Sequence, residues 1–85
     1  MIKVVFEPLA IEQILRWTTE DLKTLKKIFQ LVNNMAVTPY EGLGKPEQLK
    51  GNYSGFWSRR INQEHRIVYE VINESIVIIS LYGHY

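Results

Sequence analysis

The sequence predicts an α+β fold in which two helices form a hairpin on one face of a small, mainly antiparallel sheet. An apolar, β-branched run stands at the start of the chain, two helical stretches follow it, and three strand-like runs separated by turn residues come last. Grouped helices followed by grouped strands are typical of α+β folds. The expected element order is therefore β-α-α-β-β-β.

The first strand is expected at residues 2–6, which are apolar and mostly β-branched. Pro8 then predicts the start of a helix, because a residue in the first turn needs no N–H partner. We expect this helix to end near Trp17. Its predicted buried side chains lie on one side of the helix and are Ile11, Ile14 and Leu15.

A second helix is expected to start at Thr18, where Asp21 three residues later completes the pattern of a capping box. Its apolar residues recur at three- and four-residue spacing and predict one buried stripe. They are Leu22, Leu25, Ile28, Phe29, Val32, Met35 and Ala36. The helix is expected to end at Thr38, because the residue before a proline is pushed out of the helical region.

The second half of the chain predicts a long loop and three strands. Residues 38–55 are rich in glycine, proline and polar side chains and predict the loop, with one turn at 46–50. The predicted strands are residues 56–61, 66–72 and 76–82. The first strand completes the sheet, whose helix-free face is expected to stay open.

Size and composition limit the function classes. Eighty-five residues suggest one domain over 1–85 with a single core. The chain has no cysteine, which excludes disulfides and thiolate catalysis. The apolar run at the start is too short for a signal peptide or a membrane span, so we expect a cytoplasmic protein without a membrane partner. Two distant histidines do not have zinc-type spacing, and neither a metal nor a cofactor is predicted.

Positive charge is concentrated in one segment. The net charge of the chain is +1, yet residues 45–66 carry five cations and two acids. The same segment contains Tyr53, Phe56 and Trp57. Cations neutralise phosphates and flat rings stack on unpaired bases, so this mixture is typical of single-stranded nucleic-acid binding. A solvated face would explain the charge alone equally well.

These side chains could cleave RNA through its own 2′-hydroxyl, which requires a base, an acid and positive charge near the phosphate. Glu47 can serve as the base. Arg60 and Arg66 can clamp the phosphate, because the guanidinium fork matches two oxygens. His84 can serve as the acid if nearby anions keep it protonated. Tyr85 can stack on a base.

Each residue also has a structural interpretation. Glu47 and Lys50 have the spacing of a surface ion pair. Phe56 or Trp57 is expected in the core, since neighbours along a strand point to opposite faces. For the same reason Arg59 and Arg60 cannot both line one site.

Register tests the phosphate clamp. Arg60 and Arg66 share a face of the sheet if they lie directly opposite each other in an antiparallel pair. A register that pairs Ile61 with Arg66 would place the two arginines on opposite faces.

Several motifs resemble those of the YoeB (Txe) branch of the RelE-type bacterial toxins. They are Thr38-Pro39-Tyr40-Glu41-Gly42, Gly44-Lys45-Pro46-Glu47, Leu49-Lys50, Ser54-Gly55-Phe56-Trp57-Ser58-Arg59-Arg60-Ile61, Glu64-His65-Arg66-Ile67-Val68-Tyr69 and His84-Tyr85. The resemblance covers essentially the whole chain. It implies a RelE-like fold.

The resemblance also implies a metal-independent, ribosome-dependent endoribonuclease (an mRNA interferase) that cleaves mRNA in the ribosomal A site. Such toxins are cytoplasmic homodimers. A cognate antitoxin, here of the YefM or Axe kind, inhibits them, and the complex binds operator DNA. The family's general base falls on Glu47, its phosphate-stabilising arginine on Arg66 and its general acid on His84. Its supporting RNA contacts fall on Lys50, Arg60 and Tyr85.

One departure from the family pattern and two alternative functions accompany this resemblance. Relatives commonly carry a larger side chain at the position of Gly83, and a glycine there is expected to loosen the chain before His84. One alternative is a non-enzymatic module that inhibits the translation machinery or DNA gyrase by binding, in the manner of ParE-type relatives. The other is a degenerate toxin that acts only as a partner for antitoxin or operator. ParE-type relatives lack the Glu, Arg and terminal His-Tyr set, so its presence favours cleavage.

Overall fold

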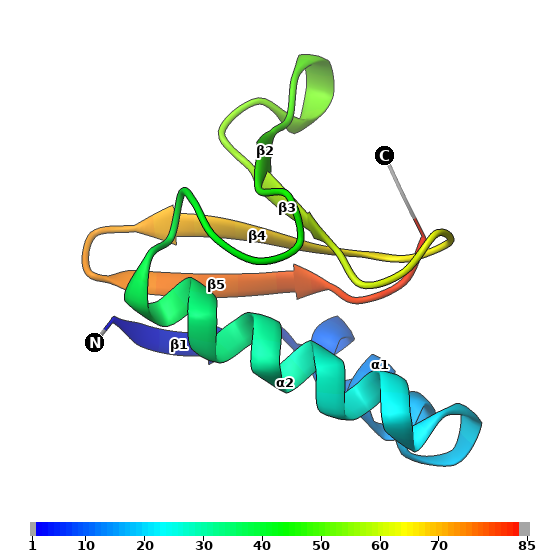
Figure 1. Cartoon of the computed structure of the whole chain (residues 1–85). Helices are drawn as coiled ribbons and strands as arrows, with labels where there is room; N and C mark the ends of the chain where they lie inside the picture. The colour runs from blue at the N-terminus through cyan, green and yellow to red at the C-terminus, as the bar shows by residue number, and fades with distance from the viewer. Residues whose placement is uncertain (1, 84–85) are drawn as a thin grey trace.

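The computed structural model describes residues 2–83, in which two helices lie on the same side of a five-stranded sheet (Figure 1). The elements are β1 (Lys3–Phe6), α1 (Pro8–Glu20), α2 (Leu22–Val37), β2 (Glu47–Gln48), the 3₁₀ turn η1 (Gly51–Tyr53), β3 (Trp57–Arg60), β4 (Arg66–Ile72) and β5 (Ser75–Ser80). The strand order is β1-β5-β4-β3-β2, and only the β1–β5 pair is parallel among these strands. The predicted α+β fold is confirmed. Neither helix of this part of the chain is long and apolar enough to cross a membrane.

The helix boundaries differ from the prediction at the junction of α1 and α2. α1 begins at Pro8, as predicted, but continues to Glu20. Thr18 therefore lies inside α1. The N-cap of α2 is Asp21, whose carboxylate accepts a hydrogen bond from the Thr24 backbone N–H at 3.1 Å. The predicted capping box at Thr18 is wrong. Asp21, which the prediction placed three residues after the cap, is itself the N-cap residue.

The buried face of α1 was mispredicted because one of its members is polar. Of the three predicted residues, Ile14 is partly buried against the core, whereas Ile11 and Leu15 are exposed. The buried residues of α1 are Ala10, Gln13 and Trp17. The Gln13 side chain is satisfied inside the protein, where its Oε1 accepts from the Leu81 backbone N–H at 2.6 Å. A search for apolar spacing alone misses such a residue.

The buried stripe of α2 is closer to the prediction. The buried residues are Leu25, Ile28, Leu31, Val32, Met35 and Ala36. Leu22 and Phe29, which were predicted in this stripe, are exposed instead. On the sheet the helices cover four fully buried side chains of β4 and β5, which are Ile67, Tyr69, Ile76 and Ile78.

The segment between α2 and β3 has more structure than the predicted loop. Glu47 and Gln48 form β2, which pairs antiparallel with β3 and adds a fifth strand to the sheet. The turn predicted at residues 46–50 is replaced by this strand, and η1 follows it. A two-residue strand is too short to produce a recognisable alternation in the sequence.

The face of the sheet opposite the helices is not uniformly open. Cross-strand pairing places Ser58, Val68 and Ser80 on the same face as Arg60 and Arg66. Those three residues are nevertheless buried, with exposed fractions of 0%, 2% and 4%. We call this surface the arginine face. Its middle is buried, and the register places Glu47, Arg60 and Arg66 on the same face next to these residues.

Candidate active site

An ion pair joins the predicted base to the predicted phosphate ligand. Glu47 lies on β2 and Arg66 is the first residue of β4. Glu47 Oε2 lies 3.5 Å from Arg66 Nη1. The Glu47 side chain is 62% exposed and the Arg66 side chain 18% exposed. The carboxylate is therefore accessible from solvent, whereas the guanidinium is held more firmly in the surface.

The second arginine of the predicted clamp has the register that the clamp requires. Arg60 pairs directly with Arg66 across the antiparallel β3–β4 ladder. Directly opposed residues of such a pair project from the same face. Arg60 is exposed there. Two guanidinium groups and one carboxylate thus belong to the arginine face, an arrangement that can bind a phosphate next to a proton acceptor.

Lys50 is near Glu47 but is not its ion partner. Both residues line a cavity of about 350 Å³, together with Gln48, Leu49 and Tyr53. No ion pair joins Glu47 to Lys50 within the part of the chain that the structure describes, since the Glu47 carboxylate pairs with Arg66. The surface-pair interpretation of this spacing is therefore not supported.

Arg59 points away from these groups, as strand alternation predicted for one of the two neighbouring arginines. Its side chain is fully buried. It donates five hydrogen bonds, to the Tyr69 hydroxyl, to Asn34 Oδ1 and to the carbonyls of Thr38, Glu41 and Leu43. These acceptors lie on α2, on β4 and in the loop that precedes β2. Arg59 thus anchors the loop that leads to Glu47.

Two aromatic residues support this anchor. The Tyr69 hydroxyl donates to the Pro39 carbonyl at 2.7 Å, and burial raises the pKa of Tyr69 above its usual value. Trp57 packs against the core, with its ring centroid 4.9 Å from that of Tyr40. The expectation that one of Phe56 and Trp57 belongs to the core is met by Trp57.

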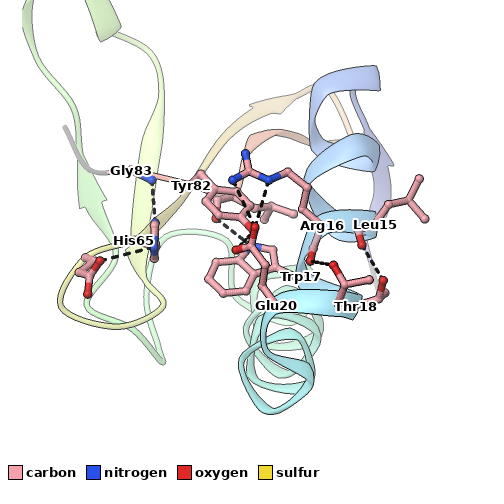
Figure 2. Close-up of polar contacts among 11 residues, drawn as sticks. Leu15, Arg16, Trp17, Thr18, Glu20, His65, Tyr82 and Gly83 are labelled. Carbon is pink, nitrogen blue, oxygen red and sulfur yellow. Dashed lines mark hydrogen bonds and ion pairs between the residues drawn. The ribbon is translucent and has the colours of Figure 1, made fainter.

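The end of the described chain is held by α1 (Figure 2). The Tyr82 ring stacks on Trp17 with centroids 4.5 Å apart, and the Arg16 guanidinium carbon lies 4.3 Å from the Tyr82 ring centroid. The Tyr82 hydroxyl donates to the Glu20 carboxylate at 2.9 Å. Burial and this hydrogen bond raise the pKa of Tyr82. These contacts return the chain end to the N-terminal helix.

Gly83 is bonded through both of its backbone groups. Its N–H donates to His65 Nδ1 at 2.9 Å (Figure 2), and its carbonyl accepts from the Arg66 N–H at 2.8 Å. Its φ of +77° lies in the left-handed region that glycine tolerates best. A glycine at this position was expected to loosen the chain before His84. The Gly83 backbone itself is held beside Arg66 by these two hydrogen bonds.

The structure describes the positions of four of the six predicted site residues. Glu47, Arg60 and Arg66 belong to one face, and Lys50 lies beside Glu47. His84 and Tyr85 lie outside the described residues. The last described residue, Gly83, lies beside Arg66, because its carbonyl accepts from the Arg66 N–H.

Sequence reasoning missed the roles of Arg59 and His65. Arg59 was counted only as one of the five cations of residues 45–66, and His65 received no role although it stands next to Arg66. Both act on backbone groups, Arg59 on carbonyls and His65 on an N–H. Such bonds leave no spacing signal, because any residue type supplies the backbone partner.

Comparison with protein families identifies a single family over most of the chain. Residues 6–85 match the model described as the YoeB-like toxin of bacterial type II toxin–antitoxin systems. Toxin YoeB of Escherichia coli strain K12 is 45% identical over 83 residues, which cover 98% of this chain and 99% of that protein.

Solved structures of similar proteins have the same fold. The YoeB/ParE toxin from Agrobacterium tumefaciens is 40% identical and superimposes with a TM-score of 0.94, over 99% of this chain and all of that one. A YoeB toxin from Staphylococcus aureus, 42% identical, has been solved as a dimer and in a heterotetrameric complex with the antitoxin YefM. The TM-scores are 0.90 over 99% of this chain and 98% of the dimer's chain, and 0.88 over 100% and 99% for the complex.

Proposed function

The chain belongs to the YoeB-like toxins of bacterial type II toxin–antitoxin systems, and we propose that it is an endoribonuclease that cleaves mRNA in the ribosomal A site. One observation carries this proposal beyond family membership. An accessible carboxylate, Glu47, lies 3.5 Å from the guanidinium of Arg66, with Arg60 on the same face. A proton acceptor beside two phosphate ligands is what cleavage by the 2′-hydroxyl requires, whereas inhibition by binding alone has no need of it.

The proposed reaction uses the RNA's own nucleophile. Glu47 takes the proton of the 2′-hydroxyl, and O2′ forms a bond to the adjacent phosphorus. The bond between phosphorus and O5′ breaks, and His84 gives a proton to the leaving O5′. The products are a 2′,3′-cyclic phosphate and a 5′-hydroxyl end. Arg66 and Arg60 stabilise the negative charge that develops on the phosphoryl oxygens, and no metal takes part in the proposed steps.

The remaining groups of the site bind RNA. Lys50 borders the same cavity as Glu47 and contacts a phosphate in this proposal. Tyr85 stacks on a base, as single-stranded RNA recognition commonly requires. The ribosome positions the mRNA in line for attack, which supplies the part of catalysis that orientation provides.

We further propose that the protein works in the cytoplasm as a homodimer under the control of a YefM-like antitoxin, and that the complex binds its operator DNA. The S. aureus structures support the homodimer and the YefM-like antitoxin, because the YoeB chain in them is 42% identical to this chain.

The decisive experiment incubates the protein with programmed ribosomes and maps the mRNA ends. We expect a new 5′-hydroxyl end within the A-site codon. His84→Ala should slow single-turnover cleavage roughly 10²–10⁴-fold while ribosome affinity changes little, because a general acid acts in the transition state.

A double variant provides the control for this assay. Inhibition of translation without a new mRNA end would support a binding toxin instead. Cleavage by the Glu47→Ala, His84→Ala double variant at the parent rate would exclude the proposed acid–base pair.

A further inference from the structure

Gly83 is fixed by two consecutive residues of the polypeptide. The Gly83 N–H donates to His65 Nδ1 at 2.9 Å, and the Gly83 carbonyl accepts from the Arg66 backbone N–H at 2.8 Å. The chain therefore passes Arg66 at a defined distance immediately before His84. Any replacement of Arg66 other than proline keeps this bond, because its donor is the backbone N–H. His65 contributes through its side chain and can be removed.

The His65 ring is oriented by two aromatic neighbours, Trp17 on α1 and Tyr82 in the segment after β5 (Figure 2). Its centroid lies 5.2 Å from that of Trp17 on α1 and 5.0 Å from that of Tyr82, with interplanar angles of 88° and 77°. The His65 backbone is fixed as well, since its N–H donates to Asn62 Oδ1 and its carbonyl accepts from the Ile61 N–H. The direction of Nδ1 toward Gly83 is thus determined before any substrate binds.

The bond to Gly83 depends on the protonation state of the imidazole. Nδ1 can accept from an N–H only while it carries no proton itself, so the proton of the neutral ring is on Nε2. On the other side of the ring, Glu64 Oε2 lies 3.9 Å from Nε2. Beyond the Tyr82 ring α1 presents Arg16 and Glu20, which pair with each other. Protonation of the imidazole removes the acceptor and replaces it with a donor that faces the Gly83 N–H.

We propose that His65 is a positioning residue for cleavage: its unprotonated Nδ1 accepts the Gly83 N–H and so fixes, beside Arg66, the backbone to which the next residue, His84, is joined. This inference rests on the proposed function, in which His84 is the general acid. It assigns His65 no contact with the substrate. A misplaced proton donor slows the chemical step while leaving the surface that binds the ribosome intact.

Two substitutions separate this role from a packing role. His65→Asn keeps an acceptor oxygen close to the position of Nδ1, and His65→Leu keeps the bulk without an acceptor. We expect single-turnover cleavage on saturating programmed ribosomes to fall roughly 10- to 100-fold in His65→Leu and to recover to within about threefold of the parent in His65→Asn. Ribosome affinity should be the same in all three proteins.

Recovery by the acceptor is a readout that packing does not affect. The amide of His65→Asn restores the acceptor without restoring the ring contacts that the imidazole makes with Trp17 and Tyr82. Equal rates for the Leu and Asn variants would overturn the positioning role.

An NMR measurement on the free protein tests the bond without any activity. The Gly83 amide proton should be protected from exchange with solvent in the parent and in His65→Asn, and it should exchange faster in His65→Leu. A Gly83 amide that is unaffected by His65→Leu overturns the present inference, whatever the parent cleaves. A parent that leaves ribosome-bound mRNA intact overturns the proposed function, whatever the Gly83 amide does.

Discussion

Arg59 and Arg60 are neighbours on β3, but they point to opposite faces of the sheet and lie in different environments. Arg59 is fully buried, and all five of its hydrogen bonds go to other parts of the protein. Arg60 is exposed on the arginine face, opposite Arg66. The same residue type thus builds the scaffold on one face of the sheet and the candidate site on the other. A count of cations along the sequence cannot separate these two uses.

The two faces also differ in what their charges contribute to stability. The Arg59 guanidinium is fully buried and donates five hydrogen bonds, so its bonds are costly to remove. The ion pair between Glu47 and Arg66 involves a carboxylate that is 62% exposed, and solvent screening leaves such pairs a contribution of about 0–1 kcal/mol. We therefore expect substitutions on the helix side to change stability and substitutions on the arginine face to change activity.

The largest effect is expected from Arg59→Met. This change removes the five hydrogen bonds that the buried guanidinium donates, and we expect the free energy of unfolding to fall by about 3 kcal/mol. Urea unfolding followed by circular dichroism measures it. The matched control is Arg60→Met, which should change stability by less than about 0.5 kcal/mol. Equal losses in the two variants would contradict the division between the faces.

Arg66→Lys tests the arginine face. Lysine keeps the positive charge but replaces the guanidinium fork with a single point donor, so one phosphate contact is lost. We expect the rate of mRNA cleavage on programmed ribosomes to fall about 10²-fold, as when one preorganised donor is removed from a transition state. The urea midpoint should stay near that of the parent. A loss of folding stability that accounts for the lower rate would show that Arg66 belongs to the scaffold instead.

The elements with strong local signals could be predicted from the sequence. Pro8 marks the start of α1, Thr38 the end of α2, and the register of Arg60 opposite Arg66 agrees with the clamp that was expected. β2 was missed because two residues show no alternation. The face of α1 was misjudged because Gln13 is buried through a bond to the distant Leu81, which no local pattern contains.

The candidate site shows the same limit. Glu47 and Arg66 were recognisable by residue type and family motif, and the structure places them 3.5 Å apart. His65 was not recognisable, because its partner is the backbone of Gly83, 18 residues further along the chain. Tertiary contacts to backbone groups are determined by the fold as a whole, so a single sequence does not reveal them.

The smallest effect is expected from Tyr69→Phe, which removes one hydroxyl from the Arg59 anchor. The hydroxyl donates to Pro39 and accepts from Arg59, and its loss should lower the free energy of unfolding by about 1 kcal/mol at pH 7. Because burial raises the pKa of Tyr69 in the folded state, the parent's unfolded chain ionises this phenol first as the pH rises above about 10. The phenol's contribution is complete below that pH and is lost above it, so the stability difference between parent and variant should shrink in alkaline solution.

Urea unfolding at pH 7 and at pH 10.5 measures both values. Tyr40→Phe, at a residue that is 53% exposed, is the control and should show little change at either pH. A stability difference for Tyr69→Phe that grows with pH would mean that the buried hydroxyl acts on the anchor in its ionised form.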